Sequence, residues 1–489
     1  MKGADSTAPL ALGLAAALGL LADGLFPAGP EGAGFALWIL FLGVAAVTVA
    51  RRVDPASAGA VGGWSAVSTA AAAALLLRDT PVVIPAMWLV MLASASMVLL
   101  RAGGVRLWTT RPVDHVVGFA AVPARAALGT IALAVDAQPP PDSSRRRIAA
   151  VLRGVVLAVP LLLLFGALFA AADAGFERYV ERFAALWLED LLAHLAVIFG
   201  FGWIAAGLLS GVRAKRLPNP FTGFTPPRLG SGETAVVLGS LAALFLTFVG
   251  FQLGYLFGGR EVIEVTSGLT VADYARRGFF ELMVVGLATV GVLLVGDALS
   301  SARRLFRWLA AVLIGCALVI LASAVQRLML YTNAFGLTVD RITAAVVMAW
   351  VAAVLVLFAV TVLRDRPGRF SSAAVLAGIA AVFVLALINP GAMAARSNLD
   401  RAMAGAREAD VAFLSHLSAD AVPAILQRVD ELPPAAQCEL GRSLLDRWGD
   451  APYGGHDDRD WRGWNAARSA ARRAVQVSEA RLTAAAHDC

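Results

Sequence analysis

The sequence predicts an all-α protein: a polytopic transmembrane helix bundle of about eleven spans, with a small helical domain outside the membrane at its C-terminal end. Three observations carry this prediction. Apolar runs of helix-spanning length recur along the chain, separated by short loops. The chain is 59% hydrophobic and only 16% charged, whereas soluble domains carry about 25% charged residues. Finally, the arginines collect in every second loop.

The apolar runs divide into an N-terminal four-span region (1–104) and a seven-span core bundle (149–388). A cytoplasmic loop (105–148) separates the two, and a C-terminal helical domain (389–489) follows. Runs of 18 or more apolar residues are the length that crosses a bilayer. The expected spans are roughly 9–26, 34–50, 60–77, 82–100, 149–172, 190–211, 234–257, 278–297, 305–325, 342–363 and 371–388.

The distribution of basic residues predicts the orientation. If the N-terminus is cytoplasmic, nineteen lysines and arginines fall in inner loops and eight in outer loops. Basic flanks resist translocation, so we expect a multi-pass protein of the bacterial inner (plasma) membrane, with a cytoplasmic N-terminus and an extracytoplasmic C-terminus. The first run lacks a signal-peptide pattern and is read as a retained helix. The net charge of +6 follows from these loops, so no nucleic-acid partner is expected.

The long loop between the two groups of spans holds a moderately apolar stretch, 113–135, interrupted by Pro123. Because proline removes a helical hydrogen bond, we expect a re-entrant or interfacial helix here rather than another full span.

Small residues at four-residue spacing predict close packing between helices. Gly207 and Gly211 show this spacing, and so do Gly250, Gly254 and Gly258.

Two outer loops contain similar strings that begin Gly-Leu-Thr-Val, at residues 268–273 and 336–340. Their threonines, Thr270 and Thr338, have the side chain and position of helix N-caps.

The composition becomes polar after Leu387, and Asn389-Pro390 marks the expected domain boundary. Amphipathic stretches near 408–417, 420–430, 436–447 and 463–486 predict about four short helices. Cys438 and Cys489 both fall in this domain, where an oxidising envelope would permit a disulfide. Whether they are bridged is left open by the sequence.

The best candidate for chemistry is the segment 274–281, which enters the eighth span from outside. Arg277 and Glu281 are four residues apart and share a helix face. They form either a structural ion pair or part of an anion site in which Arg276 or Arg277 binds phosphate or carboxylate. Other polar residues at the outer ends of neighbouring spans complete the candidate ligand-binding set, which is Tyr255, Tyr274, Arg276, Arg277, Glu281, Arg327, Tyr331 and Arg341.

Recognisable catalytic motifs are lacking. The sequence has no P-loop, no His-Glu-x-x-His, no Cys-x-x-Cys and no Gly-x-Ser-x-Gly, so the corresponding ATP, metal, redox and serine-hydrolase chemistries are not indicated. His456-Asp-Asp-Arg-Asp460 has metal-capable side chains, but helix capping before Trp461 is the simpler interpretation. No metal and no cofactor are expected.

Several strings together resemble a bacterial family of polytopic membrane proteins catalogued as a domain of unknown function. They are Tyr255-Leu-Phe-Gly-Gly259, Tyr274-Ala-Arg-Arg-Gly-Phe-Phe-Glu-Leu282, Tyr331-x-x-Ala-Phe-Gly-Leu-Thr338 with Arg341, Asn389-Pro390 and Asp460-Trp-Arg-x-Trp-Asn465. The resemblance covers roughly residue 150 to the C-terminus. It implies a membrane location and no established activity. In the expected topology the strings fall almost entirely on the outer face, which suggests an outer-face site roofed by the C-terminal domain.

The functional hypothesis is a non-enzymatic envelope transport, sensing or scaffold protein in the lipid bilayer. Its outer-face site would bind an anionic lipid head group or a small anion, and its C-terminal domain could bind a protein partner. The alternative is a membrane enzyme that acts on a lipid-linked substrate, with Glu281 as the acid or base. Whether the protein is an enzyme stays open, with the non-enzymatic reading preferred.

Overall fold

The computed structural model describes residues 7–26, 29–110, 112–136, 154, 189–214, 228–257, 279–405, 408–449 and 460–487. Within these ranges the chain is helical and forms no β-strand. Eleven of the described helices are long and apolar enough to cross a membrane, so the expected fold class is confirmed and the chain is a multi-pass membrane protein. These helices are α1 (Thr7–Leu25), α2 (Gly32–Val53), α3 (Pro55–Leu77), α4 (Val83–Ala102), α5 (Pro112–Asp136), α8 (Glu189–Arg213), α9 (Ser231–Phe257), α12 (Phe279–Leu299), α13 (Arg303–Phe335), α14 (Val339–Thr361) and α15 (Pro367–Ile388).

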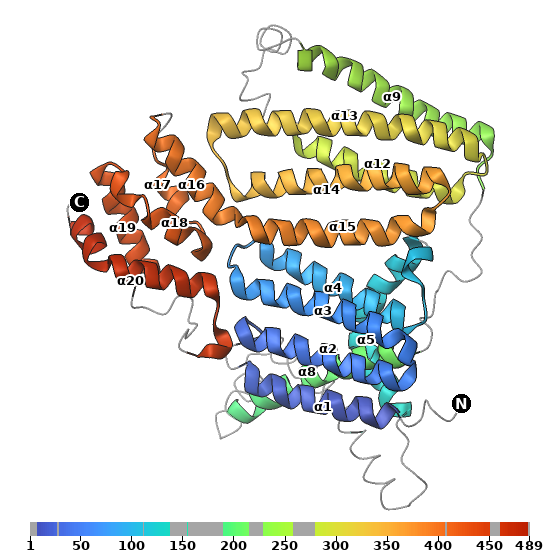
Figure 1. Cartoon of the computed structure of the whole chain (residues 1–489), viewed down its shortest axis with the longest axis horizontal. Coiled ribbons are helices and arrows are strands. Elements are labelled where there is room, and N and C mark those ends of the chain that lie inside the picture. The colour runs from blue at the N-terminus through green and yellow to red at the C-terminus, as the bar shows by residue number, and fades with distance from the viewer. Residues whose placement is uncertain are drawn as a thin grey trace, which may run out of the picture.

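The long helices pack around two separate hydrophobic cores. The first core lies among α1 to α5 and α8, and the second among α9 and α12 to α14. Helix α15 lies between the two groups (Figure 1) and joins them, because it buries Ile379 and Leu385 in the first core and Phe370 in the second.

The C-terminal part forms a third, smaller core beside one end of the bundle (Figure 1). Its helices are α16 (Pro390–Met403), α17 (Val411–Ser415), α18 (Val422–Leu426), α19 (Pro434–Trp448) and α20 (Ala466–His487). We call residues 390–487 the roof, and the end of the bundle that faces it the roof end. Helix α16 was not expected from the sequence, whereas the other roof helices coincide with the four amphipathic stretches.

The boundary between bundle and roof lies at Asn389. Helix α15 ends at Ile388 and α16 begins at Pro390. Asn389 has a φ of 50°, a left-handed conformation that asparagine tolerates better than most residues. Its side chain accepts a hydrogen bond from the backbone N–H of Ala392 at 3.1 Å and so caps α16.

Helix α5 lies at the end of the bundle opposite the roof. Near its start, His115 is 3.4 Å from Ser372 in the second turn of α15. At its other end, Asp136 forms an ion pair with Arg213, the last residue of α8. Both ends of α5 therefore lie beside the same end of the bundle. The stretch containing Pro123 is one continuous helix, and it is long and apolar enough to cross a membrane. The expectation of a re-entrant or interfacial helix therefore stays a prediction.

The glycine spacing predicted close packing correctly in α8. A Cβ added at Gly207 would lie 2.2 Å from the carbonyl oxygen of Arg125, and one at Gly211 would lie 2.6 Å from the side chain of Leu99. Gly250 instead has open space around its Cβ position. The close helix packing predicted at Gly250 is therefore wrong. Gly254 lies in a part of α9 whose side-chain surroundings are not described, and Gly258 lies outside the described residues.

The remaining expectations for the spans have mixed outcomes. Thr338 is the N-cap of α14 and accepts a hydrogen bond from Arg341 N at 3.4 Å, as expected. Thr270 and, apart from Gly154, the expected span 149–172 lie outside the described residues.

We expect Gly207→Leu to destabilise the bundle by about 1–3 kcal/mol, because the new side chain must push the backbone of α5 away from α8. Thermal unfolding of the purified protein in detergent measures the effect. Gly200→Leu, on the same helix but with nothing within 4 Å of its Cβ position, is the matched control. Equal melting temperatures for the two variants would contradict close packing at Gly207.

Candidate functional site at the roof end

The eight residues expected at the outer-face site have different placements. Tyr274, Arg276 and Arg277 lie outside the described residues, and only the backbone of Tyr255, in the last turns of α9, is described. Glu281 is exposed in the first turn of α12. Its expected partner, Arg277, is outside the described ranges, so the proposed ion pair stays a prediction.

The other three expected residues lie along α13 and the start of α14. The guanidinium of Arg341 stacks 4.1 Å above the ring of Tyr331 and donates a hydrogen bond to the Gly336 carbonyl. One turn earlier on α13, Arg327 donates to the side chain of Gln252 at 3.0 Å. These contacts join α13 to α14 and to α9.

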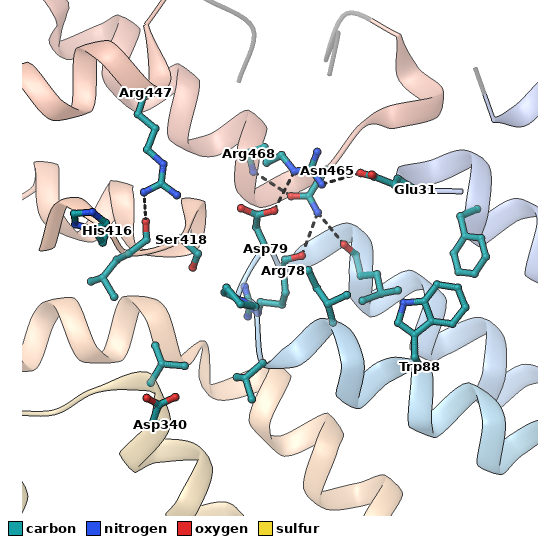
Figure 2. Close-up of a pocket in the computed structure, with 18 of the residues that line it drawn as sticks. Glu31, Arg78, Asp79, Trp88, Asp340, His416, Ser418, Arg447, Asn465 and Arg468 are labelled. Atoms are coloured by element: carbon teal, nitrogen blue, oxygen red, sulfur yellow. Dashed lines mark hydrogen bonds and ion pairs between the residues drawn. The ribbon is translucent and has the colours of Figure 1, made fainter. Parts of the chain in front are cut away.

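A large space at this end of the bundle lies elsewhere, between the helix ends and the roof. It is an open-sided cavity of about 990 Å³, within the volume range of small-ligand sites. Of the eight expected residues, the four whose side chains are described, Glu281, Arg327, Tyr331 and Arg341, do not line it. The bundle contributes the ends of α2, α3, α4 and α14, and the roof contributes α17, α19 and α20, as Figure 2 shows for Glu31, Arg78, Asp79, Trp88, Asp340, His416, Ser418, Arg447, Asn465 and Arg468.

Asn465, in the wall of this cavity, connects the end of α3 with the start of α20. Its side-chain amide donates to the carbonyls of Leu75 at 2.8 Å and Arg78 at 3.2 Å, at the C-terminal end of α3. Its side-chain oxygen accepts from the backbone N–H of Arg468 at 3.0 Å, at the start of α20. Helix ends leave backbone groups without intrahelical partners. One buried side chain therefore satisfies such groups on both the bundle and the roof.

Asp420 makes a second buried contact between roof and bundle. Its carboxylate accepts from the backbone N–H of Asp79 at 2.7 Å and from the hydroxyl of Thr80 at 2.9 Å, both in the loop after α3. Arg78 lies 3.6 Å from the other carboxylate oxygen, and the Asp420 side chain is fully buried. Burial raises the pKa of the Asp420 carboxyl, although the two hydrogen bonds and the charge of Arg78 oppose this shift.

Arg468 lies at the centre of the cavity wall. Its guanidinium contacts Asp79 at 3.0 Å and Glu31 at 3.2 Å, and so joins α20 to the loops before α2 and after α3 (Figure 2). Its side chain is only 15% exposed, which makes this pair of contacts less screened than a surface salt bridge.

Arg447 and His416 line the cavity from the roof side (Figure 2). Arg447 donates to the carbonyls of Ser415 and Leu417, each at 3.0 Å. These bonds hold the guanidinium at the wall. Arg78, Arg447 and Arg468 thus place three guanidinium groups around one space, alongside the carboxylates of Glu31, Asp79 and Asp340.

Sequence reasoning missed this cavity because its residues come from segments far apart in the chain. The available signals were Arg78, which lies in a loop predicted to be on the outer side, and the string that ends in Asn465. Nothing in the sequence shows that these two segments meet.

Residues 39–427 match the profile of a protein family described as Domain of unknown function (DUF4153). The match covers more than half of the chain. The chain belongs to this family. The DUF4153 match begins inside α2 and ends in the roof, so it includes most of the N-terminal spans that the resemblance had left out and excludes the string 460–465. Comparisons with curated proteins and with solved structures found no match.

The raised pKa of Asp420 predicts a pH-dependent stability for this DUF4153 protein. The folded chain holds the Asp420 proton more tightly than the unfolded chain does. The resulting stabilisation is present below the ordinary aspartate pKa and is lost as the pH rises through the raised one. Asp420→Asn removes this titration. We expect the stability of the wild type relative to Asp420→Asn to increase as the pH falls from neutral toward about 4.

Thermal unfolding of both proteins across this pH range measures the difference. Asp420→Ala is the companion variant: it leaves the Asp79 N–H and the Thr80 hydroxyl without their acceptor and should cost about 1–3 kcal/mol. An increase in the stability of the wild type relative to Asp420→Asn as the pH rises would contradict the assignment.

Proposed function

We propose that this integral membrane protein is a non-enzymatic envelope protein whose roofed cavity binds a phosphate-bearing or carboxylate-bearing anion, either free or as a lipid head group. Transport, sensing and scaffolding all fit such a binding site. The observation that carries the proposal is the cavity of about 990 Å³ with three arginines in its wall. A planar guanidinium matches phosphate and carboxylate oxygens in a bidentate way.

Carboxylates in and behind the cavity wall hold two of the arginine side chains in fixed positions. Arg468 is held by Asp79 and Glu31, and Arg78 is held beside Asp420. These partners position the guanidinium groups, which reduces the side-chain entropy that ligand binding would otherwise remove. The ligand then adds its oxygens to an arranged set of donors.

The location of the cavity supports an extracytoplasmic site in a bacterial inner membrane. Arginines at the ends of the described spans collect opposite the roof, as in Arg51, Arg52, Arg101, Arg213, Arg303, Arg304, Arg307, Arg364, Arg366 and Arg369. The positive-inside rule assigns that end to the cytoplasm. The roof would then face outward, with the N-terminus inside.

A disulfide supports the same orientation. Cys438 in α19 is disulfide-bonded, and Cys316 in the bundle is a free thiol. The partner suggested by the sequence, Cys489, lies outside the described residues. Disulfides persist in oxidising compartments and are rare in the cytosol, which favours a roof outside the cytoplasm.

The orientation has a direct test. We expect a reporter that is active only outside the cytoplasm to work when fused after Cys489, and a reporter that fluoresces only inside to remain dark there. The converse result would place the cavity in the cytoplasm and contradict the envelope assignment.

Arg447 provides the test of anion binding. We expect Arg447→Gln to weaken binding of glycerol 3-phosphate about tenfold or more, because a charged hydrogen bond contributes about 1.5–3 kcal/mol. Isothermal titration of the purified full chain measures the affinity.

The matched control is Arg442→Gln, on the same helix. Arg442 also donates to a backbone carbonyl, that of Ala486 at 3.3 Å, but it does not line the cavity. Equal affinities of wild type and Arg447→Gln, with both proteins folded, would refute the site.

A further inference from the structure

We infer that the ligand is a whole membrane phospholipid, with its head group in the roofed cavity and an acyl chain in an apolar groove between the two halves of the bundle. This inference rests on the proposed function and names the ligand class of that same site.

The groove is a separate space of about 600 Å³ within the membrane-spanning part. None of the described residues that line it is charged. Its walls come from α4 on one side, α12 and α14 on the other, and α15 along its length. The lining residues on which the argument depends are Val82, Leu89, Phe119, Leu287, Ala381 and Leu385.

The architecture of the bundle explains why this groove exists. The first core and the second core are separate, and α15 is the helix that lies between them (Figure 1). Where α4 and α12 face each other across α15, their side chains do not fill the space. An apolar gap of this kind in a membrane protein is filled from the surrounding hydrocarbon.

The length of the groove suits a lipid chain. Its lining on α15 runs from Phe370 to Leu385, which is about 22 Å at the helical rise. The hydrocarbon core of a bilayer is about 30 Å thick, so the groove passes the middle of the membrane. It reaches Phe119 of α5 at the end opposite the roof.

The groove and the polar cavity are neighbours at the roof end, where one residue belongs to the walls of both. Val82, the residue before α4, lines both spaces. A single ligand can therefore have a polar part among Arg78, Arg447 and Arg468 and an apolar part beside α15. This matches the charge distribution of a phospholipid, whose phosphate would meet the arginines while its chains stay in hydrocarbon.

The sides of the groove allow entry from the bilayer. Leu89 on α4 and Leu287 on α12 are 61% and 39% exposed, so the walls on both sides are open to the lipid environment. A peptide segment fits poorly here, because its backbone N–H and C=O groups would find no partners in an uncharged groove at membrane depth. A lipid chain has no such groups.

A groove-filling variant tests the inference. Ala381 lines the groove, whereas its neighbour Ala380 is exposed on another face of α15 and does not line it. We expect Ala381→Trp to weaken binding of dioleoylphosphatidylglycerol about tenfold or more, a loss of about 1.4 kcal/mol. Ala380→Trp should bind it as the wild type does. Native mass spectrometry of the full chain in detergent measures the bound lipid.

The soluble probe glycerol 3-phosphate separates the two proposals, because it carries the phosphate without chains. Unchanged binding of this probe by Ala381→Trp, together with lost lipid binding, supports the two-part site. Equal lipid binding by Ala381→Trp and Ala380→Trp would overturn the groove inference, and the anion site would stand if Arg447→Gln still weakens glycerol 3-phosphate. Failure of the wild type to bind either probe would overturn both proposals.

Discussion

The structure depends on how the polar groups at the helix ends are satisfied where the bundle meets the roof. A spanning helix ends in carbonyl groups that need partners, and here the carbonyls of Leu75 and Arg78 find them in a side chain of the roof, Asn465. Asp420 satisfies the N–H of Asp79 in the adjacent loop in the same way. Because the partners are buried, separating roof and bundle would leave these groups without hydrogen bonds. The roof is therefore part of the folded membrane domain.

This polar contact also creates the cavity. The roof is fixed to the bundle through Asn465, Asp420 and Arg468, close to the ends of α2 and α3, while α17 and α19 extend over the ends of α4 and α14. The cavity is the space that remains between these roof helices and the helix ends of the bundle. Its charged wall follows largely from the same cause. Two of the three arginines that line it, Arg78 and Arg468, are also the residues whose ion pairs hold the two parts together.

The division of the bundle into two hydrophobic cores leaves an apolar groove between them, in addition to the polar cavity. Helix α15 contacts both halves and leads at Asn389 directly into the roof. One continuous segment of chain therefore connects the junction of the two halves to the roof.

The sequence alone determined the membrane-spanning helices, the alternation of basic loops and the polar C-terminal domain that begins at Asn389. These features depend on composition along the chain, because hydrocarbon requires long apolar helices and the loops carry the charge. The sequence also identified the cap at Thr338, whose hydrogen bond with the backbone N–H of Arg341 is local in sequence. The meeting of Arg78 with Asp420 and of Leu75 with Asn465 could not be read from it, since these pairs are separated by more than 300 residues. Only the tertiary structure decided which of the loops between the helices face the roof, because that depends on how the two halves pack around α15.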